Sequence, residues 1–90
     1  MTIKLSQNSA IVYYEKAAIE YQKDGKIEKA INSFNQIDAI LNRQDKFDKA
    51  KAFLEKALEL GHSANDSGSL AIATTFITLG VTYSGENQLE

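Results

Sequence analysis

Apolar side chains recur every three or four residues along most of this chain, which is the spacing of one face of an α-helix. The first stripe comprises Ile11, Tyr14, Ala17, Ala18 and Tyr21. The segment "KDGK" at residues 23–26 then supplies Gly25, and glycine most readily adopts the left-handed conformation that ends a helix. A first amphipathic helix that ends at this glycine is therefore predicted.

Two more stripes with the same period follow. The second covers residues 27–41, until "NRQD" at residues 42–45 interrupts it. Asp45 is expected to cap the helix that comes next, because an aspartate side chain accepts hydrogen bonds from the free N–H groups of a helix start. The third stripe covers residues 47–58, which are rich in helix-favouring alanine, leucine and lysine, and Gly61 is expected to close it.

A loop and a fourth apolar stretch complete the pattern. Residues 62–69, "HSANDSGS", are polar and are predicted to form the loop, with Ser67 or Ser69 capping the next helix. The stretch from Leu70 to about Ser84 is rich in β-branched residues, which lower helix propensity, so a strand is an alternative there. A helix is preferred because an earlier pattern recurs in this stretch, and because the chain contains no proline.

Two offsets relate these stretches to one another. A shift of 62 residues maps the first helix onto the fourth: Tyr14, Ala17, Ala18, Tyr21 and Gly25 fall on Phe76, Leu79, Gly80, Tyr83 and Asn87. A shift of 20 residues maps the second helix onto the third: Ala30, Phe34 and Ile37 fall on Ala50, Leu54 and Ala57. Both sets combine large with small residues, and small residues let helices approach closely. Internal repeats are therefore predicted.

The repeated pattern resembles that of the tetratricopeptide repeat family, carried by Tyr14-x-x-Ala17-Ala18-x-x-Tyr21, Gly25 and Ala30-x-x-x-Phe34. The resemblance covers about two and a half irregular repeats within residues 11–87. It implies an all-α fold of antiparallel helix hairpins, arranged as a four-helix right-handed stack. Two family repeats of about 34 residues would give an offset of about 68. The offsets of 62 and 20 therefore imply an irregular superhelix.

The organisation and location expected from the sequence are simple. Residues 1–9 are expected to form a tail or a lead-in to the first helix, and residues 10–90 a single helical domain, which stands alone or belongs to a longer array. The chain has 43% hydrophobic and 24% charged residues, which is ordinary for a globular domain. No apolar run has the length of a signal peptide or a membrane-spanning helix, so a cytoplasmic protein is expected.

Charge and chemistry narrow the function further. Ten basic and twelve acidic residues leave a net charge of −2, which gives no reason to expect nucleic acid or a membrane as partner. In the amphipathic residues 43–56 the acidic side chains offset the lysines, so this segment is interpreted as a solvated face. The chain has no cysteine, and its one histidine, His62, stands in a polar stretch. No catalytic residue, metal site or cofactor is therefore expected, and no enzyme.

The resemblance implies a protein–protein interaction scaffold that binds a peptide or a partner helix in a concave groove. Projection of the family's groove positions implies these candidates: Val12, Glu15, Ile19, Gln22, Lys23, Thr74, Ile77, Thr78, Val81 and Ser84. Ile19, Ile77 and Val81 equally suit a core that another helix covers. One alternative is a homo-oligomerisation module, in which the uncovered C-terminal helix pairs with its copy. Another is the peptide-sensing regulatory domain of a longer protein.

Overall fold

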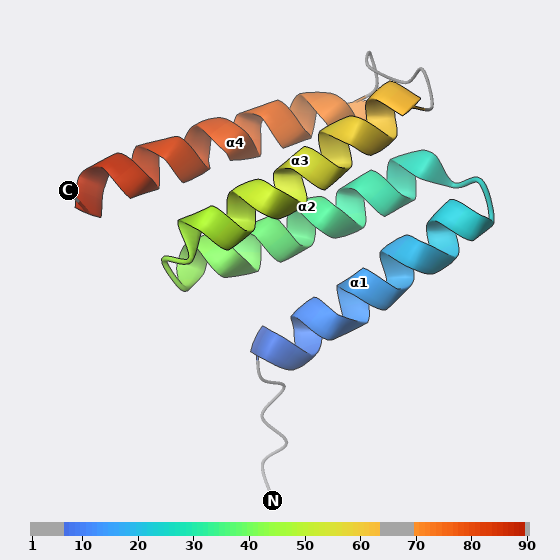
Figure 1. Ribbon diagram of the computed structural model, residues 1–90, viewed down its shortest axis with the longest axis horizontal. Coiled ribbons are helices and arrows are strands. Elements are labelled where there is room, and N and C mark those ends of the chain that lie inside the picture. Colours follow the sequence, from blue (N-terminus) through green and yellow to red (C-terminus); the bar gives the residue numbers. More distant parts are fainter. Residues whose placement is uncertain (1–6, 64–69, 90) are drawn as a thin grey trace, which may run out of the picture.

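The computed structural model describes residues 7–63 and 70–89, which form four helices (Figure 1). These are α1 (Gln7–Lys23), α2 (Ile27–Arg43), α3 (Phe47–Ser63) and α4 (Leu70–Leu89). Consecutive helices run antiparallel and no strand occurs in these ranges, so the predicted all-α fold of helix hairpins is confirmed. The strand alternative for the last stretch is wrong. The predicted loop begins too early, since His62 and Ser63 still belong to α3. Residues 64–69, which include the predicted caps Ser67 and Ser69, lie outside the described residues.

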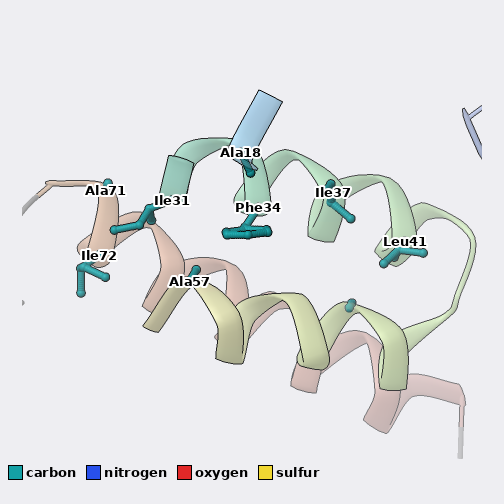
Figure 2. Close-up of a cluster of buried hydrophobic side chains, with 9 residues drawn as sticks. Ala18, Ile31, Phe34, Ile37, Leu41, Ala57, Ala71 and Ile72 are labelled. Carbon is teal, nitrogen blue, oxygen red and sulfur yellow. The ribbon is translucent and has the colours of Figure 1, made fainter. Parts of the chain in front are cut away.

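The central element is α2, because α1, α3 and α4 all pack against it. α1 and α4 lie on opposite sides of α2 (Figure 1), and the helices together span 38 × 38 × 17 Å. The core draws side chains from all four helices (Figure 2): Ala18, Ile31, Phe34, Ile37, Leu41, Ala50, Ala57, Ala71 and Ile72. Since an α-helix with its side chains is about 10–12 Å across, the domain is a thin slab whose one enclosed helix is α2.

The turns before α2 and α3 have the same geometry. Gly25 has a φ of 73° and Asp45 a φ of 57°, so both lie in the left-handed region. In each turn the next residue donates its backbone N–H to the carbonyl five residues earlier, Lys26 at 2.8 Å and Lys46 at 2.9 Å. This pattern is the Schellman motif, in which a left-handed residue ends a helix. Asp45 therefore ends α2, and the prediction that it caps the start of α3 is wrong.

The 20-residue offset corresponds to a repeat in the packing. Its members are all buried: Ala30, Phe34, Ile37, Ala50, Leu54 and Ala57. The 62-residue offset has no such counterpart. Ala18 is buried in the core, whereas Gly80 is exposed, and a Cβ built on it would meet no atom within 4 Å apart from the neighbouring backbone of its own helix. Phe76 and Tyr83 are likewise largely exposed, so α1 and α4 share a sequence pattern without sharing an environment.

Gly61 has a different role from the predicted one. It lies inside α3, which continues to Ser63, and it is buried against α4. A Cβ built on Gly61 would come within 2.9 Å of Cγ1 of Ile72, closer than nonbonded carbon atoms approach. The absence of a side chain therefore permits the close contact of α3 with α4 and does not end the helix.

The left-handed conformation at the end of α2 makes a stability prediction. We expect Asp45→Gly to raise the free energy of unfolding by about 0.5–1 kcal/mol, because the left-handed region penalises residues with a Cβ and glycine is free of that penalty. Chemical denaturation monitored by circular dichroism measures the change.

Two control variants accompany this measurement. Gly25→Asp places the opposite change in the equivalent turn and is expected to lower stability by a similar amount. Asp24→Gly adds a glycine next to that turn, at a residue without positive φ, and should not stabilise the domain. Loss of stability in Asp45→Gly would contradict the described turn.

Candidate functional site

The helix α4 lacks the usual amphipathic arrangement. On the side that packs against α2 and α3 it buries Ala71, Ile72, Thr75 and Thr82. The other side carries the large apolar side chains, which are 49–77% exposed: Leu70, Phe76, Ile77, Val81 and Tyr83. These five residues are called the outer face of α4 below. A helix usually turns such residues toward the core, so their exposure identifies the most unusual surface of the described chain.

The inward threonines of α4 meet a polar stripe on α2. Asn35, Asp38 and Asn42 occupy positions i, i+3 and i+7, and all three lie on the side of α2 that faces α4. Near the start of α4, Thr75 Oγ1 donates to Asn35 Oδ1 at 2.9 Å and Asn35 Nδ2 donates to the Ala71 carbonyl at 3.3 Å. Residues of α2 thus face residues of α4 about 40 positions later in the sequence. This offset is expected because α2 and α4 run parallel and α3 lies between them along the chain.

A second cluster lies further along the same two helices. Asn42 Nδ2 donates to Asp38 Oδ2 at 3.0 Å and to Thr82 Oγ1 at 2.9 Å. Thr82 Oγ1 shares its proton between Asp38 Oδ1 at 3.3 Å and the Thr78 carbonyl at 3.0 Å. The side chains of Asn35, Asp38, Asn42, Thr75 and Thr82 together are called the polar seam below.

The carboxyl group of Asp38 is the one acidic group in the seam. Its side chain is fully buried. Burial raises the pKa of Asp38 from the usual 3.8 to about 6, while the hydrogen bonds from Thr82 and Asn42 act in the opposite direction. No Lys, Arg or His side chain of the described residues forms an ion pair with it. The seam therefore holds a carboxyl group that folding makes harder to ionise.

The polar seam explains why the apolar side of α4 points outward. Buried amide, hydroxyl and carboxyl groups are costly when they lack hydrogen-bond partners. If α4 rotated to bury Ile77 and Val81, the three polar groups of α2 would face aliphatic side chains. The hydrogen bonds to Thr75 and Thr82 hold α4 in the observed orientation and leave its outer face exposed.

The outer face is also free of charge. α4 contains a single charged residue, Glu86. Its carboxylate pairs with Lys51 of α3 at 2.8 Å, and Lys51 also lies 5.2 Å from the centre of the Tyr83 ring. This contact ties the end of α4 to α3 and neutralises its one charge. The outer face therefore offers apolar surface without an electrostatic preference of its own.

A second candidate surface, which is concave, lies between α1 and α3 and has α2 as its floor. One hollow of about 300 Å³ is bordered by Val12 and Glu15 of α1 and by Lys49 and Phe53 of α3. A second hollow of about 290 Å³ lies nearer the other end of the space between α1 and α3. Its border includes Gln22 of α1, Phe34 of α2, and Lys56, Glu59, Leu60 and Ser63 of α3. These two hollows are called the α1–α3 groove below.

Five of the ten predicted site residues fall on these two separate surfaces. Among those of α1, the α1–α3 groove includes Val12, Glu15 and Gln22. The other two candidates of α1, Ile19 and Lys23, are exposed outside the groove. Ile19 is 51% exposed, and Lys23 forms an ion pair with Glu20 at 3.5 Å. α1 contacts no described helix other than α2. The candidates on α1 therefore do not meet those on α4.

Of the candidates on α4, Ile77 and Val81 belong to its outer face. Thr74 and Ser84 are exposed and Thr78 is half-buried. The hydroxyl groups of Thr74 and Thr78 donate to carbonyls four residues earlier in the same helix, at 3.0 and 2.9 Å. The candidates on α1 and on α4 thus do not line one groove, and the helix opposite α1 across the α1–α3 groove is α3.

Sequence reasoning missed two sets of residues. The α3 side of the groove, which includes Lys49 and Phe53, lies in the segment interpreted as a solvated face. The 20-residue offset, which aligns this segment with α2, was the available signal that the segment takes part in helix packing. The polar seam was also missed, although Asn35, Asp38 and Asn42 interrupt the apolar pattern of α2 at helical spacing.

Comparisons of this chain with family models, with curated proteins and with solved structures found no match. The tetratricopeptide resemblance therefore stays a prediction. Within residues 7–63 and 70–89, no helix combines the length and the apolar character that crossing a membrane requires. Nor do three or more potential metal ligands of the His, Cys, Asp or Glu type gather in these ranges.

The buried carboxyl group makes a prediction about pH. The pKa of Asp38 is higher in the folded than in the unfolded chain, so the folded state binds its proton more tightly. Protonation of Asp38 therefore contributes to the free energy of unfolding, and this contribution is fully present below about pH 4 and is lost as the pH rises through about 6. Relative to Asp38→Asn, the free energy of unfolding of the wild-type protein should fall by on the order of 2–3 kcal/mol between pH 4 and pH 7.

Denaturant titrations at several pH values measure this difference. Asp48→Asn is the matched control, because the Asp48 side chain is 99% exposed and contacts only Lys51, at 3.7 Å. A similar pH dependence for the two variants would show that burial of Asp38 does not affect its protonation.

Proposed function

We propose that this chain is a protein–protein interaction domain that binds a helix of its partner on the outer face of α4. One observation carries the proposal: α4 buries Thr75 and Thr82 and leaves five large apolar side chains 49–77% exposed. Soluble monomers rarely leave a contiguous apolar surface of this kind uncovered, and such surfaces commonly mark interaction sites. The resemblance to a family of scaffold proteins supports the same class of function, and the cytoplasm is the compartment we propose for it.

The shape of the outer face favours a helix as its occupant. Leu70, Ile77 and Val81 follow one another at intervals of seven and four residues, which is the spacing that a packed helix contacts. Gly80 lies among them with open space above its Cα, so a side chain of the partner can enter there. An extended peptide would gain less, because the backbone groups of a helix are already paired and offer it no main-chain hydrogen bonds.

A second candidate function is the binding of an extended peptide in the α1–α3 groove. The two hollows between α1 and α3 favour this function, since the ring of Phe34 borders one and the aliphatic side chain of Leu41 borders the other. Lysines on α3 and glutamates on both helices border the groove, which suits a peptide with apolar anchors and mixed charges. A peptide-sensing regulatory domain would use this same groove.

The test of the main proposal uses a panel of synthetic amphipathic peptides that form stable helices with an uncharged apolar face. At least one helical peptide is expected to bind, as measured by fluorescence anisotropy. Ile77→Glu should weaken that binding at least tenfold, because it places a charge in an apolar contact. Ile19→Glu is the matched control, since it introduces the same change at another half-exposed isoleucine, on α1. Equal effects of the two variants, or no binding by any helical peptide, would refute the proposal.

The groove is tested in parallel with extended peptides. Gln22→Ala changes a residue that borders the groove and belongs to α1, which does not contact α4, and it should alter the affinity for such peptides without unfolding the domain. Circular dichroism confirms the fold. If extended peptides bind and respond to Gln22→Ala while helical peptides do not bind, the groove is the functional surface.

A further inference from the structure

We infer that the occupant of the outer face is a second copy of this chain, whose α4 lies antiparallel to the first about a two-fold axis. The inference rests on the proposed function, since it names the partner of the same surface. Three properties of the outer face support it: its charge, its pattern of large and small residues, and its area.

The absence of charge makes the outer face compatible with itself. In a two-fold interface each residue of the patch meets a residue of the same patch, so an unpaired charge would approach its like. The only charge on α4 is that of Glu86, which Lys51 of the same chain already pairs. The α1–α3 groove is different, because charged side chains of both signs line it, and two copies would have to match each lysine with a glutamate.

Large residues of the outer face alternate with smaller exposed residues of α4 in a way that an antiparallel copy complements. Leu70, Ile77 and Ser84 recur every seven residues, and Ala73, Gly80 and Asn87 form a second such row beside them. If the two-fold axis passes between the levels of residues 78 and 79, Ile77 of each chain lies over Gly80 of the other. The open space above Gly80 then receives a side chain, as a knob enters a hole.

The same alignment places the other residues favourably. Ala73 faces Ser84 of the second chain, so two small side chains allow the helices to approach closely. Phe76 comes beside Tyr83 of the second chain, which permits an aromatic contact at each side of the axis. Opposed helix directions also place the two helix dipoles antiparallel.

The available area is sufficient for a reversible dimer. Large apolar and aromatic side chains carry on the order of 150–250 Å² each, so five that are 49–77% exposed offer on the order of 500–600 Å² per chain. If all of this surface were covered, two copies would bury at most about 1,000–1,200 Å² in total, which is at the lower limit for specific interfaces. A dissociation constant in the micromolar range is therefore expected.

Sedimentation equilibrium of the full chain, from about 1 to 500 μM, tests the association. A monomer–dimer equilibrium is expected, with Ile77→Glu raising the dissociation constant more than tenfold and Ile19→Glu changing it less than twofold. A monomer at every concentration, or a dimer that Ile77→Glu leaves intact, would overturn the inference. If the chain is monomeric while helical peptides still bind α4, only the second copy is refuted. If neither binds, the proposed function fails as well.

Introduced cysteines test the antiparallel arrangement, because the chain has none of its own. Ala73→Cys and Ser84→Cys replace exposed small residues by one of similar size. The two variants, mixed in equal amounts and mildly oxidised, should form mainly the disulfide between positions 73 and 84, since these positions face each other and disulfides require close Cα atoms. Disulfides mainly between identical positions would mean a parallel pair and would overturn the inference.

Discussion

The arrangement of this domain depends on the buried hydrogen bonds between α2 and α4. Leaving a buried polar group without a partner costs about 1–3 kcal/mol, and the seam contains several such groups. The hydrogen bonds of Asn35 with Thr75, and of Asp38 and Asn42 with Thr82, are made only in one rotational setting of α4. That setting turns Ile77 and the other large apolar side chains into solvent. The stability of the core and the exposure of the apolar side chains of α4 thus have a single physical origin.

The central position of α2 follows from the composition of its faces. Its apolar residues meet α1 and α3, while its polar stripe meets α4, so little of its circumference remains in solvent. Three different neighbours are therefore recognised by one 17-residue helix. The neighbours differ in what they require: small and aromatic side chains pack by shape, whereas Asp38 requires hydrogen-bond donors.

The helices and the turn at Gly25 could be predicted from the sequence. The helices follow from the local spacing of apolar residues, and the turn follows from the ability of glycine to adopt a positive φ. It was misleading at Asp45, since aspartate suits both a helix start and a left-handed turn. The orientation of α4 could not be predicted, because its apolar residues and threonines surround the helix almost evenly. The information that orients it lies on α2, about 40 residues earlier, and acts only when the two helices meet.

The attachment of α1 has a consequence for motion. This helix rests on α2 alone, whereas α2, α3 and α4 each contact at least two others. Its release would leave the hydrogen-bonded pair of α2 and α4 intact and would uncover the ring of Phe34 and its aliphatic neighbours. Segments held by a single neighbour open at lower free energy than the rest of a domain. The described chain thus comprises three helices that contact one another and one edge helix, whose amide hydrogens we expect to exchange sooner, at the side of the slab opposite to α4.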